Sequence, residues 1–343
     1  MTKSPVPIRF KDTQIELAHG SGGKASRRLV EGLIAPILGN PSLDDAALLS
    51  LGGASLALTA DSFVVKPLRF PGGSIGELAV NGTVNDLAVS GARPIALLST
   101  LILEAGLSAQ VLQAELQAIG QAARRAGVQV VGGDTKVVEH GKADGLFIST
   151  SGIGLVDARV NLAASSVRPG DKVLLSGPIG DHGITILLAR GELDLEASLK
   201  SDTRSVWPFV EALIETVAPG LRWMRDPTRG GVATALNELA REAQLALRLY
   251  EEHIPVRDEV RGACEILGLD PLHIANEGQF IAIVGPEYAE AALEAVRRVA
   301  GGQEARLIGE VVETPAGVVY TVSSYGSSRV VDMLVGDPLP RIC

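Results

Sequence analysis

Acidic side chains recur directly behind apolar runs along this chain. They stand in "LDDAALL" (Asp44 and Asp45), "LTADS" (Asp61), "VNDLA" (Asp86, beside Asn85) and "VVGGDTK" (Asp134). Carboxylates crowded into one place repel one another unless a cation lies among them. Mg²⁺ is typically held by a few carboxylates together with substrate phosphates. Each Asp alone is more simply explained as a turn or capping residue, but the whole set favours a cation site.

Glycine is abundant and clustered. The chain has 39 glycines in 343 residues, which is about 11% against a usual ~7%. They gather where apolar runs end, as in "HGSGGKAS", "VVGGDTK" and "TRGGVA", and such loops let backbone N–H groups approach a phosphate closely. Yet "AHGSGGKA" departs from a P-loop at Ala18 and Ala25, and "GIGLVD" has Asp157 where a dinucleotide fingerprint needs glycine. A nucleotide would therefore bind by another route.

The last residue of the sequence, Cys343, is a candidate chemical handle. It follows "GDPLPRI", a stretch that we expect to have no means of packing and to form a mobile tail. Residues 330–343 could span about 45 Å at ~3.3 Å per residue. The adjacent terminal carboxylate should keep the thiol pKa above ~8.5, so its reactivity would come from a partner. Cys264, in "GACEILGL", is expected to be a buried structural cysteine.

Strands and helices must position these residues. Hydrophobic periodicity predicts strands over 54–65, 128–135, 145–156 and 279–285, helices over 76–94, 108–127, 228–244 and 287–301, and a strand, glycine turn and helix start over 171–185. The helix over 108–127 has Ser108 as N-cap and Gly127 as C-cap. Its apolar residues Val111, Leu112, Leu116 and Ile119 share one face. The sequence therefore predicts a mixed α/β fold.

Length and composition set further limits. A chain of 343 residues exceeds what one core usually organises, and "SSVRPGD" is the expected boundary between domains 1–164 and 165–329, followed by the tail 330–343. Apolar runs stay below the 18 residues needed to span a bilayer, and the first residues do not resemble a signal peptide. We therefore expect a cytoplasmic protein that does not bind membranes. The net charge of −9 argues against nucleic-acid binding.

Six motifs along the chain carry a resemblance to a known superfamily. They are, in order, "GSGG", "DDAA", "TADS", "NDLAVSGARP", "GGDTK" and "DPTRGGVATALNE". Together they resemble the ATP-binding superfamily of aminoimidazole ribonucleotide synthetase (AIRS, PurM), selenophosphate synthetase and thiamine monophosphate kinase. The terminal "PRIC" is similar to one member family, the carbamoyl dehydratases of nickel-iron hydrogenase maturation. The match spans essentially the whole chain.

This resemblance implies a two-domain α/β (α+β) fold of the PurM/AIRS type, in which the N-terminal sheets of a homodimer form a shared barrel. It implies ATP and Mg²⁺ as cofactors. The implied cofactor-binding residues are Gly22, Gly23, Asp44, Asn85, Gly132 and Gly133. The implied metal ligands are Asp45, Asp61, Asp86 and Asp134, and the choice between Asp44 and Asp45 stays open. The implied catalytic residues are Cys343, Glu277 and Lys136.

The activity implied is that of an enzyme that uses ATP to dehydrate an S-carbamoyl group on Cys343 to a thiocyanate, the source of the hydrogenase cyanide ligands. The implied partners are the carbamoyl donor HypF and, as cyanide acceptor, the HypC–HypD complex. Because an amide oxygen leaves poorly, ATP would phosphorylate it, which needs a dry site, a base and a nearby cation. Glu277, in "ANEGQF", is the candidate base, and Lys136 would stabilise the oxygen or the phosphoryl group. Without the resemblance, both would be taken for solvated surface residues.

Two other functions stay open from the residues. One is a small-molecule synthetase or kinase of the same superfamily, such as a selenophosphate synthetase, although "HGSGGKAS" lacks the cysteine or selenocysteine that those enzymes usually carry there. The other is a non-catalytic thiol carrier, which would have no need of an acidic cluster. Arg229, in "TRGG", could contact phosphate or form an ion pair between domains. His140 could line the site, and the histidines lack zinc-binding spacing.

Overall fold

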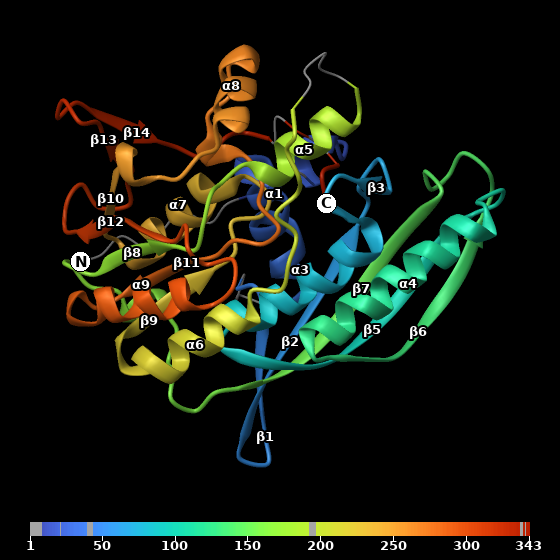
Figure 1. Cartoon of the computed structure of the whole chain (residues 1–343), viewed down its shortest axis with the longest axis horizontal. Coiled ribbons are helices and arrows are strands. Elements are labelled where there is room, and N and C mark those ends of the chain that lie inside the picture. Colours follow the sequence, from blue (N-terminus) through green and yellow to red (C-terminus); the bar gives the residue numbers. More distant parts are fainter. Residues whose placement is uncertain (1–8, 21, 40–43, 192–196, 337–338, 340) are drawn as a thin grey trace.

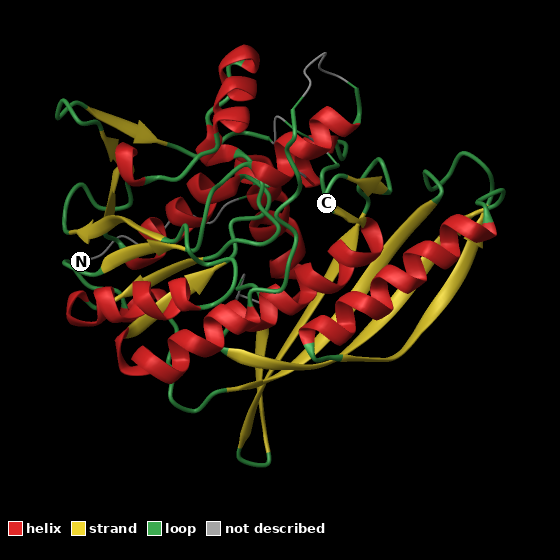
Figure 2. Cartoon of the chain, in the orientation of Figure 1, coloured by secondary structure: helices red, strands yellow, loops and turns green. Residues whose placement is uncertain are grey.

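Two β-sheets, one in each half of the chain, form the framework of the protein (Figures 1 and 2). This computed structural model describes residues 9–20, 22–39, 44–191, 197–336, 339 and 341–343. The first sheet has the order β1 (Ala47–Leu51), β2 (Ala54–Phe63), β7 (Leu146–Val156), β5 (Ala92–Glu104) and β6 (Gln129–Val138). The second has the order β14 (Ser328–Val331), β13 (Val319–Val322), β10 (Ala246–Tyr250), β12 (Arg306–Val312), β8 (Lys172–Leu175), β11 (Ile281–Val284) and β9 (Leu221–Arg225).

Helices and short segments connect these strands. The helices are α1 (Gly23–Leu29), α2 (Ala35–Leu38), α3 (Ile75–Val89), α4 (Ala109–Ala126), α5 (Asp181–Ala189), α6 (Trp207–Val217), α7 (Gly231–Ala243), α8 (Asp258–Leu267) and α9 (Ala289–Arg298). β3 (Arg69–Phe70) and β4 (Gly73–Ser74) form a small hairpin before α3. The shorter helical segments are η1 (Leu17–Gly20), η2 (Val30–Ile34), η3 (Ala164–Ser166), η4 (Ala218–Gly220), η5 (Glu251–His253), η6 (Pro271–His273) and η7 (Pro286–Tyr288).

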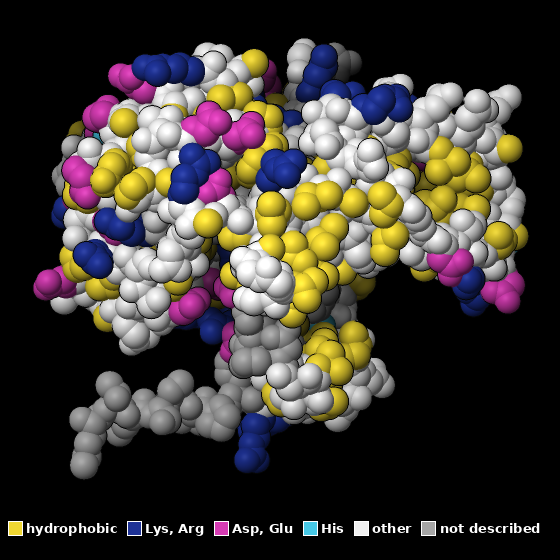
Figure 3. All heavy atoms as spheres, turned by 90° about the horizontal axis from the view of Figure 1, so that it is seen from below, with side chains coloured by type: hydrophobic (Ala, Val, Ile, Leu, Met, Phe, Trp, Pro, Cys, Tyr) yellow, Lys and Arg dark blue, Asp and Glu magenta, His cyan; other side chains and the backbone are white. Residues whose placement is uncertain are grey.

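Among the described residues, helices cover the first sheet on one face only. Helices α3 and α4 pack on that face (Figure 1), and α4 is the crossover between the parallel strands β5 and β6. Alternate residues of β2, such as Ala57 and Phe63, are buried against α3, whereas Leu58 points to the other face and is exposed. Viewed from below (Figure 3), hydrophobic side chains gather on the half of the molecule that contains this sheet.

The second sheet is covered on both faces. In β8, Val173 and Leu175 join an apolar cluster with α7, while Leu174 joins a separate cluster with α6 and α9. The residues of β11 alternate between the same two clusters. Because both faces are buried, these strands are continuously apolar in sequence. The observed architecture confirms the predicted mixed α/β fold with two units.

Some predicted elements differ in detail. Ser108 and Gly127 cap α4 as predicted, with the Ser108 hydroxyl accepting from the Gln110 amide. The predicted apolar face of α4 is wrong in part, because Val111 and Leu116 are exposed and Glu115 is buried instead. The Glu115 carboxylate accepts a hydrogen bond from the Gly76 amide at the start of α3, so the inward face of α4 also carries a polar contact.

The boundaries also shift by a few residues. Helix α3 ends at Val89, because Gly91, with a φ of 74°, turns the chain directly into β5, and Pro94 lies in that strand. The predicted boundary at 164/165 falls in η3, between the sheets, and the one at 329/330 falls within β14. These domain limits stay predictions.

The segment after β14 packs against the protein. The expectation that it has no means of packing is wrong, because Leu339 and Ile342 are 5% and 1% exposed and join the apolar cluster beneath α3 and α5. Mobility of this tail stays a prediction. Cys264 is buried, as expected. Within the described part of the chain, no helix is long and apolar enough to cross a membrane.

Candidate functional site

Three carboxylates from both halves of the chain meet between the two sheets. Asp45 stands just before β1, Asp86 lies on α3, and Asp226 follows β9. One carboxylate oxygen from each lies within 4.8 Å of the others. The predicted ligands Asp45 and Asp86 therefore converge, and they do so with a residue of the second half that sequence reasoning had not selected.

Asp61 lies beside this group because of the alternation of β2. Thr59 and Asp61 both face α3, where the Thr59 hydroxyl donates to the Asp86 carboxylate at 2.8 Å and the Thr83 hydroxyl donates to Asp61 at 3.2 Å. We call Asp45, Asp61, Asp86 and Asp226 the acid cluster. Three of its members come from the first half of the chain and one from the second.

Burial and mutual repulsion weaken the acidity of the cluster. Burial, followed by the charges of Asp61 and Asp226, raises the pKa of Asp86 well above its ordinary value. Burial also raises the pKa of Asp226 well above its usual range and that of Asp45 to about 6. A divalent cation among the oxygens would offset the repulsion and favour the ionised carboxylates. The donor set, carboxylates within 4.8 Å of one another, fits Mg²⁺.

A cleft of about 570 Å³ adjoins the acid cluster. The glycine loop before α1 forms one wall, with Gly22 and Gly23 at φ values of 81° and 71°. Asp44 lines this cleft, next to Asp45. Arg229 lines it from the other half and donates to the Gly20 carbonyl at 2.8 Å. The predicted glycine loop and the "DPTRGG" motif thus face one cavity.

Glu277 is buried close to the acid cluster. It is 3% exposed, and its Oε1 is buried without a hydrogen-bond partner among the described residues. Burial and then the charge of Asp226 raise its pKa well above the ordinary value, whereas Arg229 lowers it. The Asp202 carboxylate holds its backbone by accepting from the Glu277 amide at 3.0 Å. The alternative that Glu277 is a solvated surface residue is therefore wrong.

Cys343 lies at the end of the strand that carries Asp61. A main-chain carboxylate oxygen of Cys343 accepts a 3.0 Å hydrogen bond from the amide of Val64, the residue after β2. Its half-buried side chain packs against an apolar cluster that includes Phe63. Across from Phe63 lies Gly82 of α3, where an added Cβ would lie 2.8 Å from the Phe63 ring and 4.0 Å from Glu277 Oε2. Gly82 therefore lies where the Phe63 ring and Glu277 leave no room for a side chain.

The predicted residues on β6 lie elsewhere in this chain. Asp134 and Lys136 are exposed and pair with each other at 2.6 Å. Asp134 is in register with Thr100 of β5, on the sheet face opposite to the one that carries Asp61. Gly132 and Gly133 lie on the same strand, and a side chain at Gly133 would collide with the Ser99 carbonyl.

Asn85 and His140 bind other residues of the same chain. The Asn85 amide donates to the Arg204 carbonyl at 3.0 Å and to the Glu277 carbonyl at 3.3 Å, and its oxygen accepts from the Val206 amide. Asn85 therefore holds the two halves together beside Glu277. His140 is exposed and pairs with Glu104 at 3.0 Å. Asp226 and Asp202 were missed, although Asp226 begins the quoted "DPTRGG" motif.

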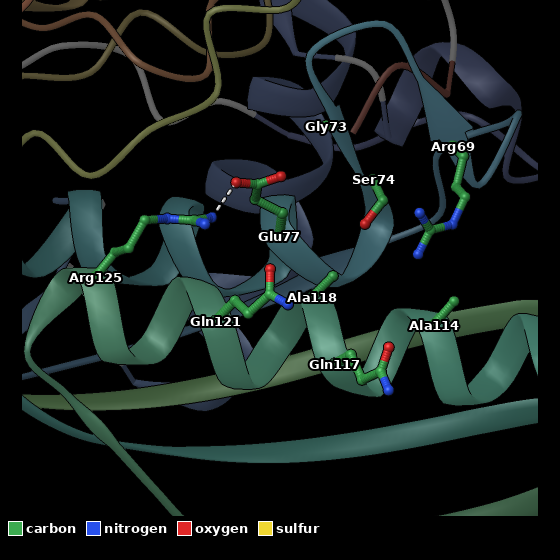
Figure 4. Close-up of a pocket in the computed structure, with 9 residues that line it drawn as sticks. All are labelled: Arg69, Gly73, Ser74, Glu77, Ala114, Gln117, Ala118, Gln121 and Arg125. Carbon is green, nitrogen blue, oxygen red and sulfur yellow. Dashed lines mark hydrogen bonds and ion pairs between the residues drawn. The ribbon is translucent and has the colours of Figure 1, made fainter.

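A second hollow, of about 380 Å³, lies between α3 and α4 (Figure 4). Arg125 reaches across it to pair with Glu77 near the start of α3. Glu77 and Asp86 are nine residues apart on α3, or about 13 Å at 1.5 Å per residue. This hollow is therefore separate from the acid cluster.

Comparisons with known proteins agree with this arrangement. The sequence matches the family models of the AIR synthase related protein, N-terminal domain, over residues 43–156, and C-terminal domain, over residues 168–322. It is 49% identical over 339 residues to carbamoyl dehydratase HypE of Azotobacter vinelandii, covering 98% of this chain and 99% of that protein.

Solved structures of HypE proteins are also similar to this chain. A HypE–HypF complex matches with a TM-score of 0.85 and 42% identity, covering 89% of this chain and 99% of that one. HypE in complex with ATP matches with a TM-score of 0.81 and 46% identity, covering 95% and 99%. The shared fold, the near-complete coverage and the identity place this chain in the HypE family of carbamoyl dehydratases, among the AIR synthase related proteins.

Proposed function

We propose that this chain uses ATP to dehydrate an S-carbamoyl group on its own Cys343 to a thiocyanate, for the cyanide ligands of nickel-iron hydrogenase. The observation that carries the proposal is the hydrogen bond from the Val64 amide to a main-chain carboxylate oxygen of Cys343. Val64 is three residues beyond Asp61, or about 10 Å along the strand at ~3.3 Å per residue. The docked tail therefore ends beside the strand that carries Asp61, about 10 Å from that residue along the strand.

The reaction needs phosphorylation of the amide oxygen followed by elimination. The carbamoyl oxygen attacks the γ-phosphorus of ATP, and ADP leaves. The nitrogen then loses two protons while the C–O bond breaks and phosphate departs, which leaves S–C≡N. Glu277 is the proposed base, because a carboxylate with a raised pKa is a stronger base than an ordinary glutamate. Its unpartnered Oε1 is free of competing hydrogen bonds within the described structure.

The nucleotide is proposed to bind in the cleft beside the acid cluster. Gly22, Gly23 and Asp44 line that cleft, and the backbone of such a glycine loop suits phosphate oxygens. Asp45, Asp61 and Asp86, joined by Asp226, are the proposed ligands of Mg²⁺, which when bound would neutralise the charge of the phosphates. Arg229 would balance further negative charge from the cleft wall. The HypE–ATP complex of a relative supports this assignment.

A homodimer is proposed through the open face of the first sheet. That face exposes Leu58, Leu98 and Leu155, an apolar surface of the kind that marks an interface. Asp134 and Lys136 lie on the same face, so their proposed roles in metal binding and catalysis depend on a second copy, as do those of Gly132 and Gly133. Asn85 stays a proposed cofactor-binding residue. It would act indirectly, through the hydrogen bond from its amide to the Glu277 carbonyl.

Two partners are proposed for the reaction cycle. HypF is the proposed carbamoyl donor, which the HypE–HypF complex of a relative supports. The HypC–HypD complex is the proposed acceptor of the cyanide. Both require the tail to leave its docked position, because the Cys343 thiol is half-buried in it.

Single-turnover assays of ATP use test this function. The carbamoylated chain should convert one ATP per thiol, whereas a Cys343→Ser variant treated in the same way should not. An Asp86→Asn variant, which keeps its carbamoyl group, should lose ATP turnover. Equal turnover in Cys343→Ser would instead favour a small-molecule enzyme. No turnover by the carbamoylated wild-type chain would favour a thiol carrier.

A further inference from the structure

The last three residues of the chain are held by their main-chain oxygens. The Arg341 carbonyl accepts a hydrogen bond from Arg190, just after α5. The Ile342 carbonyl accepts one from His182 Nε2 at 2.7 Å, and a main-chain carboxylate oxygen of Cys343 accepts one from the Val64 amide at 3.0 Å. Three donors thus bind consecutive main-chain oxygens, and two of these donors are side chains at the two ends of α5.

The hydrogen bonds of His182 give its ring one orientation. Because a carbonyl only accepts, Nε2 must carry the proton toward Ile342. Nδ1 then accepts from the Ser201 hydroxyl at 2.8 Å, and that hydroxyl oxygen accepts from the Thr203 amide at 3.1 Å. His182 is fully buried, and burial lowers its pKa, which favours this neutral form. The imidazole is therefore a fixed donor aimed at the tail.

The same network leads to the proposed base. Asp202, next to Ser201, accepts hydrogen bonds from the backbone amides of Glu277 and Gly278 at 3.0 and 3.2 Å. One short segment therefore holds His182 on one side and the Glu277 backbone on the other. The position of the tail and the position of Glu277 are set by neighbouring residues.

Two side chains of the tail also contact the rest of the protein. Ile342 is 1% exposed and joins an apolar cluster with Ile184 of α5. Arg341 pairs with Asp144, which also pairs with Lys66 at 3.2 Å. An apolar anchor thus lies between a cationic residue and the thiol.

We infer that His182 is a positioning residue for catalysis. It binds the backbone of Ile342 so that the group carried by Cys343 is aligned with Glu277. Arg190 and the apolar site for Ile342 complete this docking site, which we call the tail clamp. The inference rests on the proposed function, because positioning matters only if Cys343 carries the reacting group. The clamp itself is a physical property of the chain that can be measured without the reaction.

Alkylation of the full-length, unmodified chain measures docking directly. The rate of Cys343 modification by iodoacetamide is followed by peptide mass mapping, with buried Cys264 as the internal reference for unfolding. His182→Leu and Arg190→Met should each speed Cys343 alkylation by roughly tenfold, the effect of losing one hydrogen bond. His182→Gln, which keeps a donor, should stay near the wild-type rate. Arg297→Met is the matched control, because Arg297 makes the same kind of bond to the Ala305 carbonyl, away from the tail.

Single-turnover dehydration of the carbamoylated chain then separates positioning from folding. His182→Leu should slow the step roughly tenfold with an unchanged apparent affinity for ATP, and His182→Gln should restore the rate. If His182→Leu is alkylated and dehydrated at the same rates as the wild-type chain, the inference is overturned and the proposed function is left intact. Equal acceleration of alkylation in Arg297→Met would also overturn it. If the wild-type chain fails to dehydrate but the clamp variants still speed alkylation, the proposed function fails while the clamp stands.

Discussion

Asp86 of α3 and Asp226 behind β9 bring carboxylate oxygens within 4.8 Å of each other, although they belong to different halves of the chain. Asp45 completes the group from a third segment. The two halves therefore close around a point of concentrated negative charge, which a bound cation would turn from a repulsive contact into an attractive one.

Mg²⁺ should therefore stabilise the whole chain. We expect the midpoint of thermal unfolding to rise with Mg²⁺ concentration, because a ligand that binds only the folded state stabilises it by mass action. In Asp226→Asn this rise should be much smaller. Asp258→Asn, on the surface of α8, is the control and should respond as the wild-type chain does. An unchanged response in Asp226→Asn would remove this residue from the metal site.

Gly82 should be required for catalysis beyond its effect on stability. Gly82→Ala places a Cβ 2.8 Å from the Phe63 ring, and overpacking of this kind typically costs about 1–3 kcal/mol. Because the same atom approaches Glu277, dehydration should also slow at temperatures where the variant is fully folded. Gly120→Ala on α4 is the matched control: its Cβ has room, and it should gain about 0.5–1 kcal/mol. Normal dehydration by folded Gly82→Ala would contradict this prediction.

The open face of the first sheet should hold two copies together. Leu98→Glu introduces charge into the centre of this face, where Leu98 is 48% exposed in the single chain. Sedimentation velocity should then report monomers for this variant and dimers for the wild-type chain. Ile266→Glu changes an equally apolar exposed residue on α8 and should stay dimeric. A monomeric wild-type chain would refute the proposed dimer.

Stability should depend on pH through Asp181. Burial raises the pKa of this carboxyl to about 6, although Arg257 pairs with it. A folded-state pKa above the unfolded value gives a stabilisation that is complete below about pH 4 and is lost as the pH rises through 6. Relative to Asp181→Asn, the wild-type chain should lose up to about 3 kcal/mol over this range. Urea unfolding at pH 4, 5, 6 and 7 measures the difference, and parallel curves would contradict it.

The fold could be predicted because its signals are local. The caps Ser108 and Gly127 and the doubly buried strand over Lys172–Leu175 act through neighbouring residues. The face of α4 was not predictable from apolar spacing, because Glu115 points inward to cap a different helix.

The site was predictable in part for the same reason. Asp45, Asp61 and Asp86 follow apolar runs, so their convergence could be expected. Asp226 comes from the other half, and no local pattern reports a contact of this range. The packing of the tail was not predicted, because Leu339 and Ile342 join an apolar cluster made by distant elements, which "GDPLPRIC" alone does not reveal.

The central claim is that this chain catalyses a reaction on its own last residue. A mass spectrum of the C-terminal peptide, taken after incubation with the carbamoyl donor system and then with ATP, tests it most directly. We predict the gain of a carbamoyl group on Cys343 followed by the loss of one water, and in Glu277→Gln the gain without the loss. A carbamoylated Cys343 that keeps its water in the wild-type chain with ATP and Mg²⁺ would contradict the account.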